Sequence, residues 1–510
     1  MKPSPQGRRG GAEGAPQAQR HARGQRQDRA LPALRAFELR GPYLAPLVLA
    51  LLARLDFARQ LPWAAEDAYI TFRYAENWAH GFGLVYNAGE RVMGFSSPLW
   101  TAWLALGALI HVPTLLWARG WGIAFDLGAL VLTTRLLERE TSRASAWAFA
   151  VFFAVFPLFS SNAVLGMETS LLVFLLAASA TAVRERHAAA GPLIALLALT
   201  RPEGFVAALV VLVFADRRAR VVAGAILATV VAVLWGYYGS PIPQSVTAKA
   251  VTYGVGERPV AIEWLEGFVP AFLKRQWQEL NEAQHLFSIS VLTLPAAILG
   301  MAHMMRERRA SGAIALAGLI VLFGYAALGV PYFGWYFVLP VFGWSVAVAA
   351  GLPQVIRSRL VWAALAVYVL TDALFLGQLY IGRDQTEGWL FGTAATTLRD
   401  ASHGRGTVFL EPIGHIGYVS GLRVIDEVGL VSPEIPRMRM RGPGWYTDVV
   451  RKRRPDYLVV RPALIDKNQP LAGIAAPFRS LAERDSVFID YMPVAPRNAA
   501  DELLVLRRTR

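Results

Sequence analysis

Eleven apolar runs constrain the fold of this chain more than any other feature. They cover residues 41–58, 98–112, 115–136, 144–160, 168–184, 190–214, 219–238, 285–303, 311–330, 333–350 and 359–381. A membrane-spanning helix needs about 20 mostly apolar residues. The 98–112 run is short, and Arg201-Pro202-Glu203-Gly204 interrupts the 190–214 run. Hydrophobic residues make up 55% of the chain, above the roughly 45–50% of soluble domains. The sequence therefore predicts an α-helical polytopic membrane protein with about 11 membrane segments.

The net charge of +14 is concentrated outside these runs. Basic residues lie in the N-terminal tail and in turns at residues 135–143, 184–187, 216–220, 306–309 and 357–359. Cytoplasmic loops of membrane proteins carry an excess of Lys and Arg. We therefore interpret the charge as a topology signal and not as a nucleic-acid surface. It predicts a cytoplasmic N-terminus, an outer loop at 59–97 and a C-terminus outside.

Composition divides the chain into three parts. Residues 1–40 lack apolar periodicity and are predicted to form a disordered basic cytoplasmic tail. Residues 41–381 form the predicted transmembrane catalytic domain. In residues 382–510, β-rich runs at Thr407–Leu410, Tyr457–Val460 and 503–506 alternate with helix-like stretches such as 393–401, which predicts a small extracytoplasmic α/β domain. The chain has no Cys, which excludes disulfides and thiol chemistry.

The predicted topology brings four polar segments to one outer face. They contain the acid pair Glu66-Asp67 in the outer loop, Glu168 in GMETS, the TRPEG turn, and Lys249 in PIPQSVTAK. Polar groups at membrane depth are costly, so their convergence indicates a functional site.

Six motifs occur in order along the chain: EDAYITFRYAENWAHGFGLVYNAGERVMGFSSPLW, GMETS, TRPEG, PIPQSVTAKA, PYFGWYFVLP and EPIGHIGYVSGLRVIDEVGLVSP followed by RRPDYLVV. Together they resemble a bacterial branch of the GT-C glycosyltransferases, and most closely the mycobacterial terminal β-1,2-arabinofuranosyltransferases. The resemblance covers most of residues 41–465. It implies a multi-pass enzyme of the bacterial inner membrane that uses a polyprenyl-phosphate sugar at the outer face. The family pattern often begins with two Asp, whereas this chain has Glu66 and Asp67, so the identity of the base stays open.

The expected chemistry explains the residue types. A glycosyl phosphate already has a good leaving group, so transfer needs a base for the acceptor hydroxyl and cations for the departing phosphate. One carboxylate can act without a nucleophilic partner, which gives inversion and makes a glycosidase-type acid pair unnecessary. We favour Asp67 as the base, because repulsion between adjacent carboxylates can raise one pKa. Glu66 would orient the acceptor or help to hold a divalent metal, although two acids alone do not define a metal site.

The resemblance also nominates substrate-binding residues, each with a structural alternative. Arg73 is a candidate phosphate clamp or the ion-pair partner of Glu66, seven residues earlier on the same helical face. His80 is either structural or an acceptor contact.

Four further candidates lie in the later motifs. Glu168 is either an acid favoured at a helix N-terminus or a site residue. Arg201 and Glu203 either neutralise each other, or Arg201 faces a lipid phosphate. Lys249 either snorkels to headgroups or contacts the donor phosphate.

The leading prediction is an inverting glycosyltransferase that moves a sugar, with a pentofuranose as one candidate, from a polyprenyl-phosphate donor to an extracytoplasmic glycan, lipid or protein. The expected partners are this donor, the acceptor and membrane lipid, with no nucleic acid. One alternative is a lipid-linked sugar transporter or flippase, which would show internal sequence repeats and charged residues at the middle of the membrane. A second alternative is a lipid-linked oligosaccharide ligase or polymerase. A third is a membrane scaffold protein, which would tolerate loss of Glu66 and Asp67.

Overall fold

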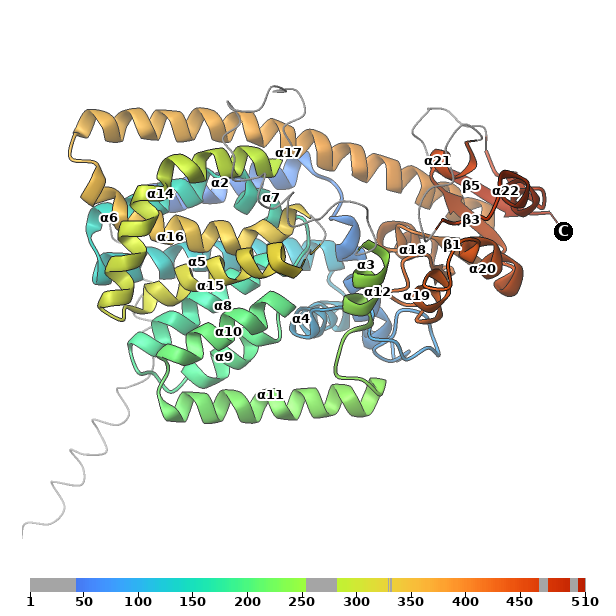
Figure 1. Cartoon of the computed structure of the whole chain (residues 1–510), viewed down its shortest axis with the longest axis horizontal. Helices are drawn as coiled ribbons and strands as arrows, with labels where there is room; N and C mark the ends of the chain where they lie inside the picture. Colours follow the sequence, from blue (N-terminus) through green and yellow to red (C-terminus); the bar gives the residue numbers. More distant parts are fainter. Residues whose placement is uncertain are drawn as a thin grey trace, which may run out of the picture. The chain divides into compact units, whose positions relative to one another are not determined.

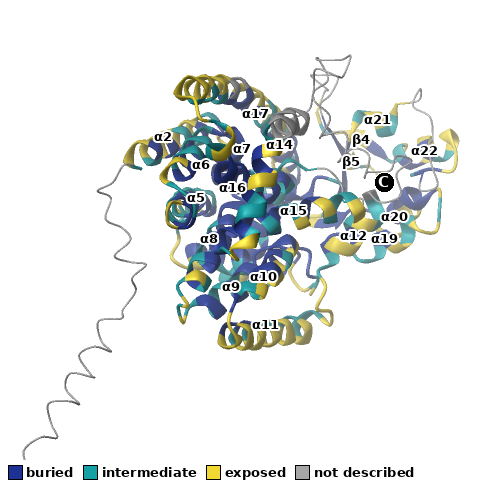
Figure 2. Cartoon of the chain, turned by 60° about the vertical axis from the view of Figure 1, so that its left-hand side comes forward, coloured by how far each residue is buried: buried dark blue, intermediate teal, exposed yellow. Residues whose placement is uncertain are grey.

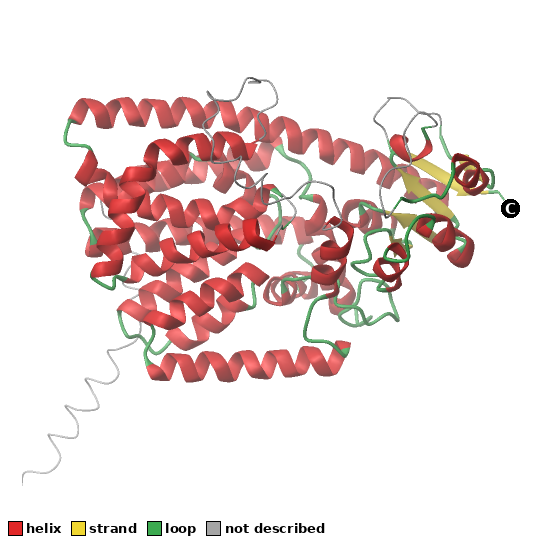
Figure 3. Ribbon diagram, in the orientation of Figure 1, coloured by secondary structure: helices red, strands yellow, loops and turns green. Residues whose placement is uncertain are grey.

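In the part of the chain that the structure describes, most residues are helical and strands occur only toward the C-terminus (Figures 1 and 3). The computed structural model describes residues 43–253, 282–328, 330, 333–466, 476–495 and 503–509. The predicted tail at 1–40 lies outside the described residues. Contacts divide the chain into Met1–Ala45 and Pro46–Arg510, and the architecture described below belongs to the second unit.

The helices before the sheet are α2 (Leu44–Gln60), α3 (Glu66–Ala79), α4 (Pro98–Leu109), α5 (Thr114–Glu140), α6 (Arg143–Val155), α7 (Pro157–Val164), α8 (Thr169–Arg184), α9 (Ala190–Ala198), α10 (Pro202–Phe214), α11 (Arg217–Tyr238), α12 (Gln244–Tyr253), α14 (Glu282–Arg306), α15 (Ala310–Leu328), the short 3-10 helix η4 (Gly334–Phe337), α16 (Val338–Val355) and α17 (Arg359–Ser402). Within the described residues, five of these elements are long and apolar enough to cross a membrane, namely α5, α11, α15, η4 with α16, and α17. The bent pair α6 and α7 adds a sixth if it is one span. The polytopic helical class is confirmed, while the number of crossings stays a prediction.

The two unusual apolar runs form short helices. The 98–112 run contains the 12-residue α4, and the 190–214 run is split into α9 and α10 at Arg201. Pro202 occupies the first turn of α10, a position where its missing N–H costs nothing. The hairpin predicted for residues 190–214 therefore has its TRPEG turn between two helices that pack on each other.

Small residues and a buried ion pair between α2 and α5 help to hold the helices together. Gly300 of α14 and Gly351 of α16 face each other so closely that a Cβ on either would overlap the backbone of the opposite helix, as in small-residue contacts between membrane helices. Arg54 of α2 donates to Asp126 of α5 at 2.8 Å and to the carbonyl of Phe153 of α6 at 2.9 Å. This fully buried guanidinium thus joins three helices. Figure 2 shows that α11 and the first part of α17 are largely exposed, whereas α16 is largely buried.

The C-terminal part is a five-stranded mixed sheet with helices. Its elements are β1 (Thr407–Leu410), α18 (Ile413–Ser420), β2 (Arg423–Asp426), α19 (Glu434–Arg439), α20 (Trp445–Arg453), β3 (Tyr457–Val460), α21 (Pro462–Ile465), α22 (Leu481–Phe488), β4 (Tyr491–Pro493) and β5 (Leu504–Arg508). The strand order is β2-β1-β3-β5-β4, with β1 parallel to β2 and β3 and with β5 antiparallel to β3 and β4. The small α/β domain expected from the sequence is confirmed as a fold.

The sheet separates two hydrophobic cores. Alternate side chains of each strand point to opposite faces, so Val408 and Leu410 belong to one core and Phe409 to the other. The first core also contains residues of α3 and of the loop after it, such as Tyr74 and Tyr86. The predicted outer loop at 59–97 therefore packs against the C-terminal sheet. Figure 1 shows α17 running from the helical bundle to this sheet without a break, across the boundary predicted at residue 382.

Candidate active site

The acid pair occupies the first two positions of α3. Glu66 and Asp67 follow Ala65, whose N–H donates to the carbonyl of Leu165 at 2.9 Å. Carboxylates are favoured in the first turn of a helix because they face its positive end. This helix start therefore suits both acids and fixes them beside the segment that leads into α8.

Asp67 is paired with a cation from a distant segment. Lys249 of α12 places its Nζ 3.0 Å from Oδ2 of Asp67, and the same ammonium lies 5.0 Å from the ring centroid of Phe333. The two side chains are 21% and 23% exposed. The pair is therefore open to a small molecule and not sealed in the core.

Glu66 has a different environment from its neighbour. Its Oε1 accepts the backbone N–H of Gly414, at the beginning of α18. A Cβ at Gly414 would overlap the backbone of Glu66, so only glycine permits this approach. Burial, then the nearby charges of Asp67 and Glu411, raise the pKa of the Glu66 carboxyl well above its usual range, and the Gly414 N–H opposes this only in part. Glu66 consequently holds its proton more tightly than an ordinary glutamate. The repulsion between the two acids therefore raises the pKa of Glu66, and the case for Asp67 as the base rests on its contact with Lys249.

The acid pair lines a cavity of about 590 Å³, which we call the main cavity. One part of its wall is apolar and comes from the helical bundle: Leu165, Phe333, Trp335, Phe337, Leu379 and Tyr380. Another part is charged and comes from α17 and the C-terminal domain: Arg383, Asp384, Glu387, Glu411 and Arg461. Along α17 the lining extends from Leu379 to Phe391, about 18 Å of helix. The cavity therefore offers apolar and charged surfaces to one ligand.

The charged wall is built from ion pairs. Nη2 of Arg461 lies 2.7 Å from Oε2 of Glu411, and Nη2 of Arg383 lies 2.6 Å from Oδ1 of Asp384. His415 lies nearby, stacked on Tyr69 with ring centroids 4.3 Å apart. Burial lowers the pKa of His415 to about 4, so this imidazole is neutral at pH 7.

A second, small cavity of about 50 Å³ shares Asp67 and Lys249 with the main cavity. Its wall also includes Glu168 and Arg201. Arg201 forms ion pairs with both Glu168 and Glu203, and all three residues are buried. The mutual neutralisation considered for Arg201 and Glu203 thus occurs, with Glu168 as a third partner.

Arg73 and His80 lie outside both cavity linings. Arg73 donates to the carbonyls of Tyr86 at 2.9 Å, Gly417 at 2.6 Å and Leu422 at 2.7 Å. It thereby ties α3 to the C-terminal domain, an arrangement that favours neither the phosphate clamp nor the pair with Glu66. His80 is exposed at the end of α3, with Nδ1 2.7 Å from the carbonyl of Glu76, which favours the structural alternative.

The main-cavity residues that were not singled out from the sequence include Trp335, Arg383, Asp384, Glu387, Glu411, His415 and Arg461. Three of them lay within quoted motifs, since Trp335 is in PYFGWYFVLP and Glu411 and His415 are in EPIGHIG. In the part of the chain that the structure describes, no group of three or more His, Cys, Asp or Glu residues is arranged to hold a metal ion.

Comparison with solved structures shows that the chain shares its fold with known proteins. ArnT from Cupriavidus metallidurans, solved with undecaprenyl phosphate bound, matches with a TM-score of 0.58 at 11% identity, over 91% of this chain and 97% of that chain. The archaeal oligosaccharyltransferase AglB from Archaeoglobus fulgidus, in complex with an inhibitory peptide and a dolichol-phosphate, matches with a TM-score of 0.53 at 14% identity, over 83% and 69%. The chain has the GT-C fold. At these identities the likeness concerns the fold alone.

Other comparisons are less informative. The arabinofuranosyltransferase AftD from Mycobacteria matches at 17% identity over 91% of this chain and 41% of that chain, with a TM-score of 0.42, too low to support the arabinofuranosyltransferase branch. Residues 379–500 match a family model described as a domain of unknown function, DUF8728. A sequence comparison with curated proteins gives no significant match.

Proposed function

We propose that this GT-C chain is an inverting glycosyltransferase that moves a sugar from a polyprenyl-phosphate donor to an extracytoplasmic acceptor. The observation that carries the proposal is the partly exposed Asp67–Lys249 pair, which lines the same cavity as the apolar and the charged side chains. A lipid-linked sugar has the matching character, with an apolar chain, an anionic phosphate and a polar sugar. The undecaprenyl phosphate bound to ArnT and the dolichol-phosphate bound to AglB support this donor class.

In the proposed reaction, Asp67 takes the proton of the acceptor hydroxyl. The acceptor oxygen forms a bond to the anomeric carbon while the bond from this carbon to the phosphate oxygen breaks. The polyprenyl phosphate leaves with one additional negative charge, and Lys249 stabilises this charge. A single displacement of this kind inverts the anomeric centre.

Lys249 has a second part in the proposal, because one ammonium serves two anions. Without donor, Lys249 is held by Asp67 at 3.0 Å. An arriving phosphate competes for the same ammonium, since charge-assisted hydrogen bonds to phosphate and carboxylate are alike in kind. Donor binding thus draws Lys249 away from Asp67 and frees the carboxylate to act as a base.

Glu66 is assigned a positioning role. Its carboxyl is fixed by Gly414 and keeps its proton more readily than usual, which suits a hydrogen-bond donor to the acceptor or to Asp67. The charged wall of Arg383, Glu387, Glu411 and Arg461 is the proposed contact surface of the acceptor. Arg201, which is ion-paired with Glu168 and Glu203, is proposed to support the shape of the phosphate site.

The proposed topology places this site on the outer face of the bacterial inner membrane, with the N-terminus in the cytoplasm. Reporter fusions at residues 40 and 510 test it. An alkaline-phosphatase fusion at 510 should be active, whereas activity of a cytoplasmic reporter at that position would move the site to the inner face.

The function is tested in membranes with a panel of radiolabelled polyprenyl-phosphate sugars. Asp67→Asn should reduce transfer by about 10²–10⁴-fold, the usual loss for a general base, with unchanged protein folding. Asp400→Asn is the matched control, because this carboxylate lies far along α17 and its side chain is 72% exposed. Normal transfer by Asp67→Asn together with an inactive Glu66→Gln would reassign the base to Glu66. Transfer by both variants would refute the mechanism, and transfer only from lipid-diphosphate oligosaccharides would favour the ligase alternative.

A further inference from the structure

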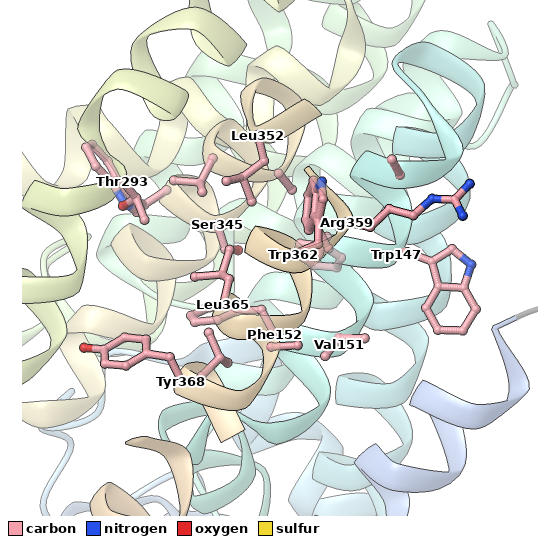
Figure 4. A pocket seen from close by; sticks show the side chains of 18 residues that line it. Trp147, Val151, Phe152, Thr293, Ser345, Leu352, Arg359, Trp362, Leu365 and Tyr368 are labelled. Atoms are coloured by element: carbon pink, nitrogen blue, oxygen red, sulfur yellow. The ribbon is translucent and has the colours of Figure 1, made fainter. Parts of the chain in front are cut away.

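A third cavity lies between α6, α14, α16 and α17, away from the acid pair (Figure 4). Its volume is about 440 Å³, and its described lining is almost entirely apolar. Among the described residues of the lining there is no carboxylate, and Arg359 is the one charged side chain. We call it the α17 groove.

The groove is long and follows a single face of α17. Its lining on this helix extends from Arg359 to Val369, which is about 15 Å of helix. Ala148 of α6 and Ala366 of α17 are small residues in this lining. A long apolar channel walled by small and aromatic side chains fits an extended hydrocarbon chain better than a compact ligand.

One end of the groove is cationic and aromatic. Figure 4 shows the Arg359 guanidinium and the Trp147 indole close together at one side, with Trp362 next to Arg359. Arg and Trp are the residues that anchor membrane proteins at the headgroup level. Arg357, two residues before Arg359, adds a second exposed positive charge to the same turn.

We propose that the α17 groove binds one acyl chain of an anionic membrane phospholipid, whose headgroup phosphate lies at Arg359. The cationic end and the absence of carboxylates from the lining select a net negative headgroup over a zwitterionic one. The turn at residues 357–359 lies on the inner side in the predicted topology, where surface lipids are anionic. The bound acyl chain fills the space between α6 and the first half of α17. It thereby stabilises the position of α17, the helix that also contributes Arg383 to the wall of the main cavity. The proposal is independent of the glycosyltransferase function.

Native mass spectrometry of the purified full chain tests this, with phosphatidylglycerol and phosphatidylcholine added separately. We expect one phosphatidylglycerol to be retained in preference to phosphatidylcholine. Arg359→Gln should lower phosphatidylglycerol affinity about fivefold, the equivalent of about 1 kcal/mol per basic residue at a membrane surface. Arg218→Gln is the matched control, because Arg218 is an exposed basic residue of another turn on the same predicted side.

Two filling variants, Ala148→Trp and Ala366→Trp, act from opposite walls of the groove, so that poor folding of one leaves the other available. Both should lose the retained phospholipid while binding of polyprenyl phosphate at the main cavity is unchanged. Equal retention of the two lipids, or full retention of phosphatidylglycerol in the filling variants, would overturn the proposal. Displacement of phosphatidylglycerol from the groove by polyprenyl phosphate would also overturn it and assign the groove to the carrier lipid.

Discussion

Asp67→Asn should abolish sugar transfer and yet tighten the binding of a polyprenyl phosphate. The reason is the competition for Lys249, whose Nζ lies 3.0 Å from Asp67 in the donor-free structure. In Asp67→Asn, the phosphate no longer has to displace a carboxylate from the Lys249 ammonium. It also no longer faces the negative charge of that carboxylate. Lys249→Met should have the opposite effect, because it removes the cation that both anions use.

The expected changes in phosphate affinity follow from the contact between the Lys249 ammonium and the phosphate. A hydrogen bond to a charged group contributes about 1.5–3 kcal/mol, and 1.36 kcal/mol corresponds to a factor of ten. Lys249→Met should therefore weaken phosphate binding about 10- to 150-fold. The gain in Asp67→Asn should be smaller, about 3- to 10-fold, because both side chains of the pair are about one-fifth exposed and water screens them.

The assay is the affinity of the purified chain for undecaprenyl phosphate in detergent, measured by calorimetric titration at pH 7 without acceptor. Lys452→Met and Asp400→Asn are the matched controls, since both are exposed charges outside the cavity linings. Weaker binding by Asp67→Asn would refute the exchange of Lys249 between the two anions. Unchanged binding by Lys249→Met would remove this residue from the phosphate site altogether.

Three further variants test the packing around the site. Arg54→Met should lower the unfolding free energy by about 3–5 kcal/mol, because it leaves Asp126 buried and unpaired. The control Arg59→Met changes an exposed guanidinium and should have little effect. Equal unfolding midpoints of the two variants would contradict this prediction. The pKa of His415 is about 4 in the folded chain and near 6.5 in the unfolded chain, so the contribution of this residue to stability is complete above pH 6.5 and is lost as the pH falls toward 4. His415→Phe should therefore remove a stability loss of about 3 kcal/mol on acidification. Parallel pH profiles of stability for the variant and the original chain would contradict this. Gly414→Ala should reduce transfer with the chain still folded, and normal transfer would show that the approach to Glu66 is dispensable.

Hydropathy predicted where the apolar helices lie, but neither which of them span the membrane nor where they end. The apolar run at 359–381 ends where polar residues begin, yet α17 continues to Ser402. Residues such as Arg383, Gln385 and Glu387 are good helix formers, so the backbone stays helical after its surroundings change. Strands β1 and β3 were found as apolar runs with the bounds that the structure has. Strand β2 was missed because Arg423–Asp426 begins and ends with a charged residue, and strand β4 was missed because Tyr491–Pro493 has only three residues and ends with Pro.

The alternative that paired Arg73 with Glu66 shows where periodicity misleads. Seven residues return a helix to the same face, but they also separate the two Cα atoms by about 10.5 Å along the axis. Ion pairs on helices form between residues three or four apart, at about 5–6 Å. Arg73 bonds instead to carbonyls of the C-terminal domain, which lie more than 300 positions away in the sequence and cannot be predicted from local spacing.

The charged wall of the main cavity follows from sheet order, which the sequence does not specify. Glu411 comes directly after β1 and Arg461 directly after β3, and these strands are parallel neighbours. Residues that follow the ends of adjacent parallel strands meet at one sheet edge, where α/β folds usually bind ligands. The ion pair of Arg461 with Glu411 is therefore a product of topology. Because α17 reaches this edge, the sheet and the membrane helices contribute to the same wall. A substitution that shifts the end of α17 relative to the sheet should consequently impair use of the polar acceptor more than binding of the lipid phosphate, whose cation Lys249 lies on α12.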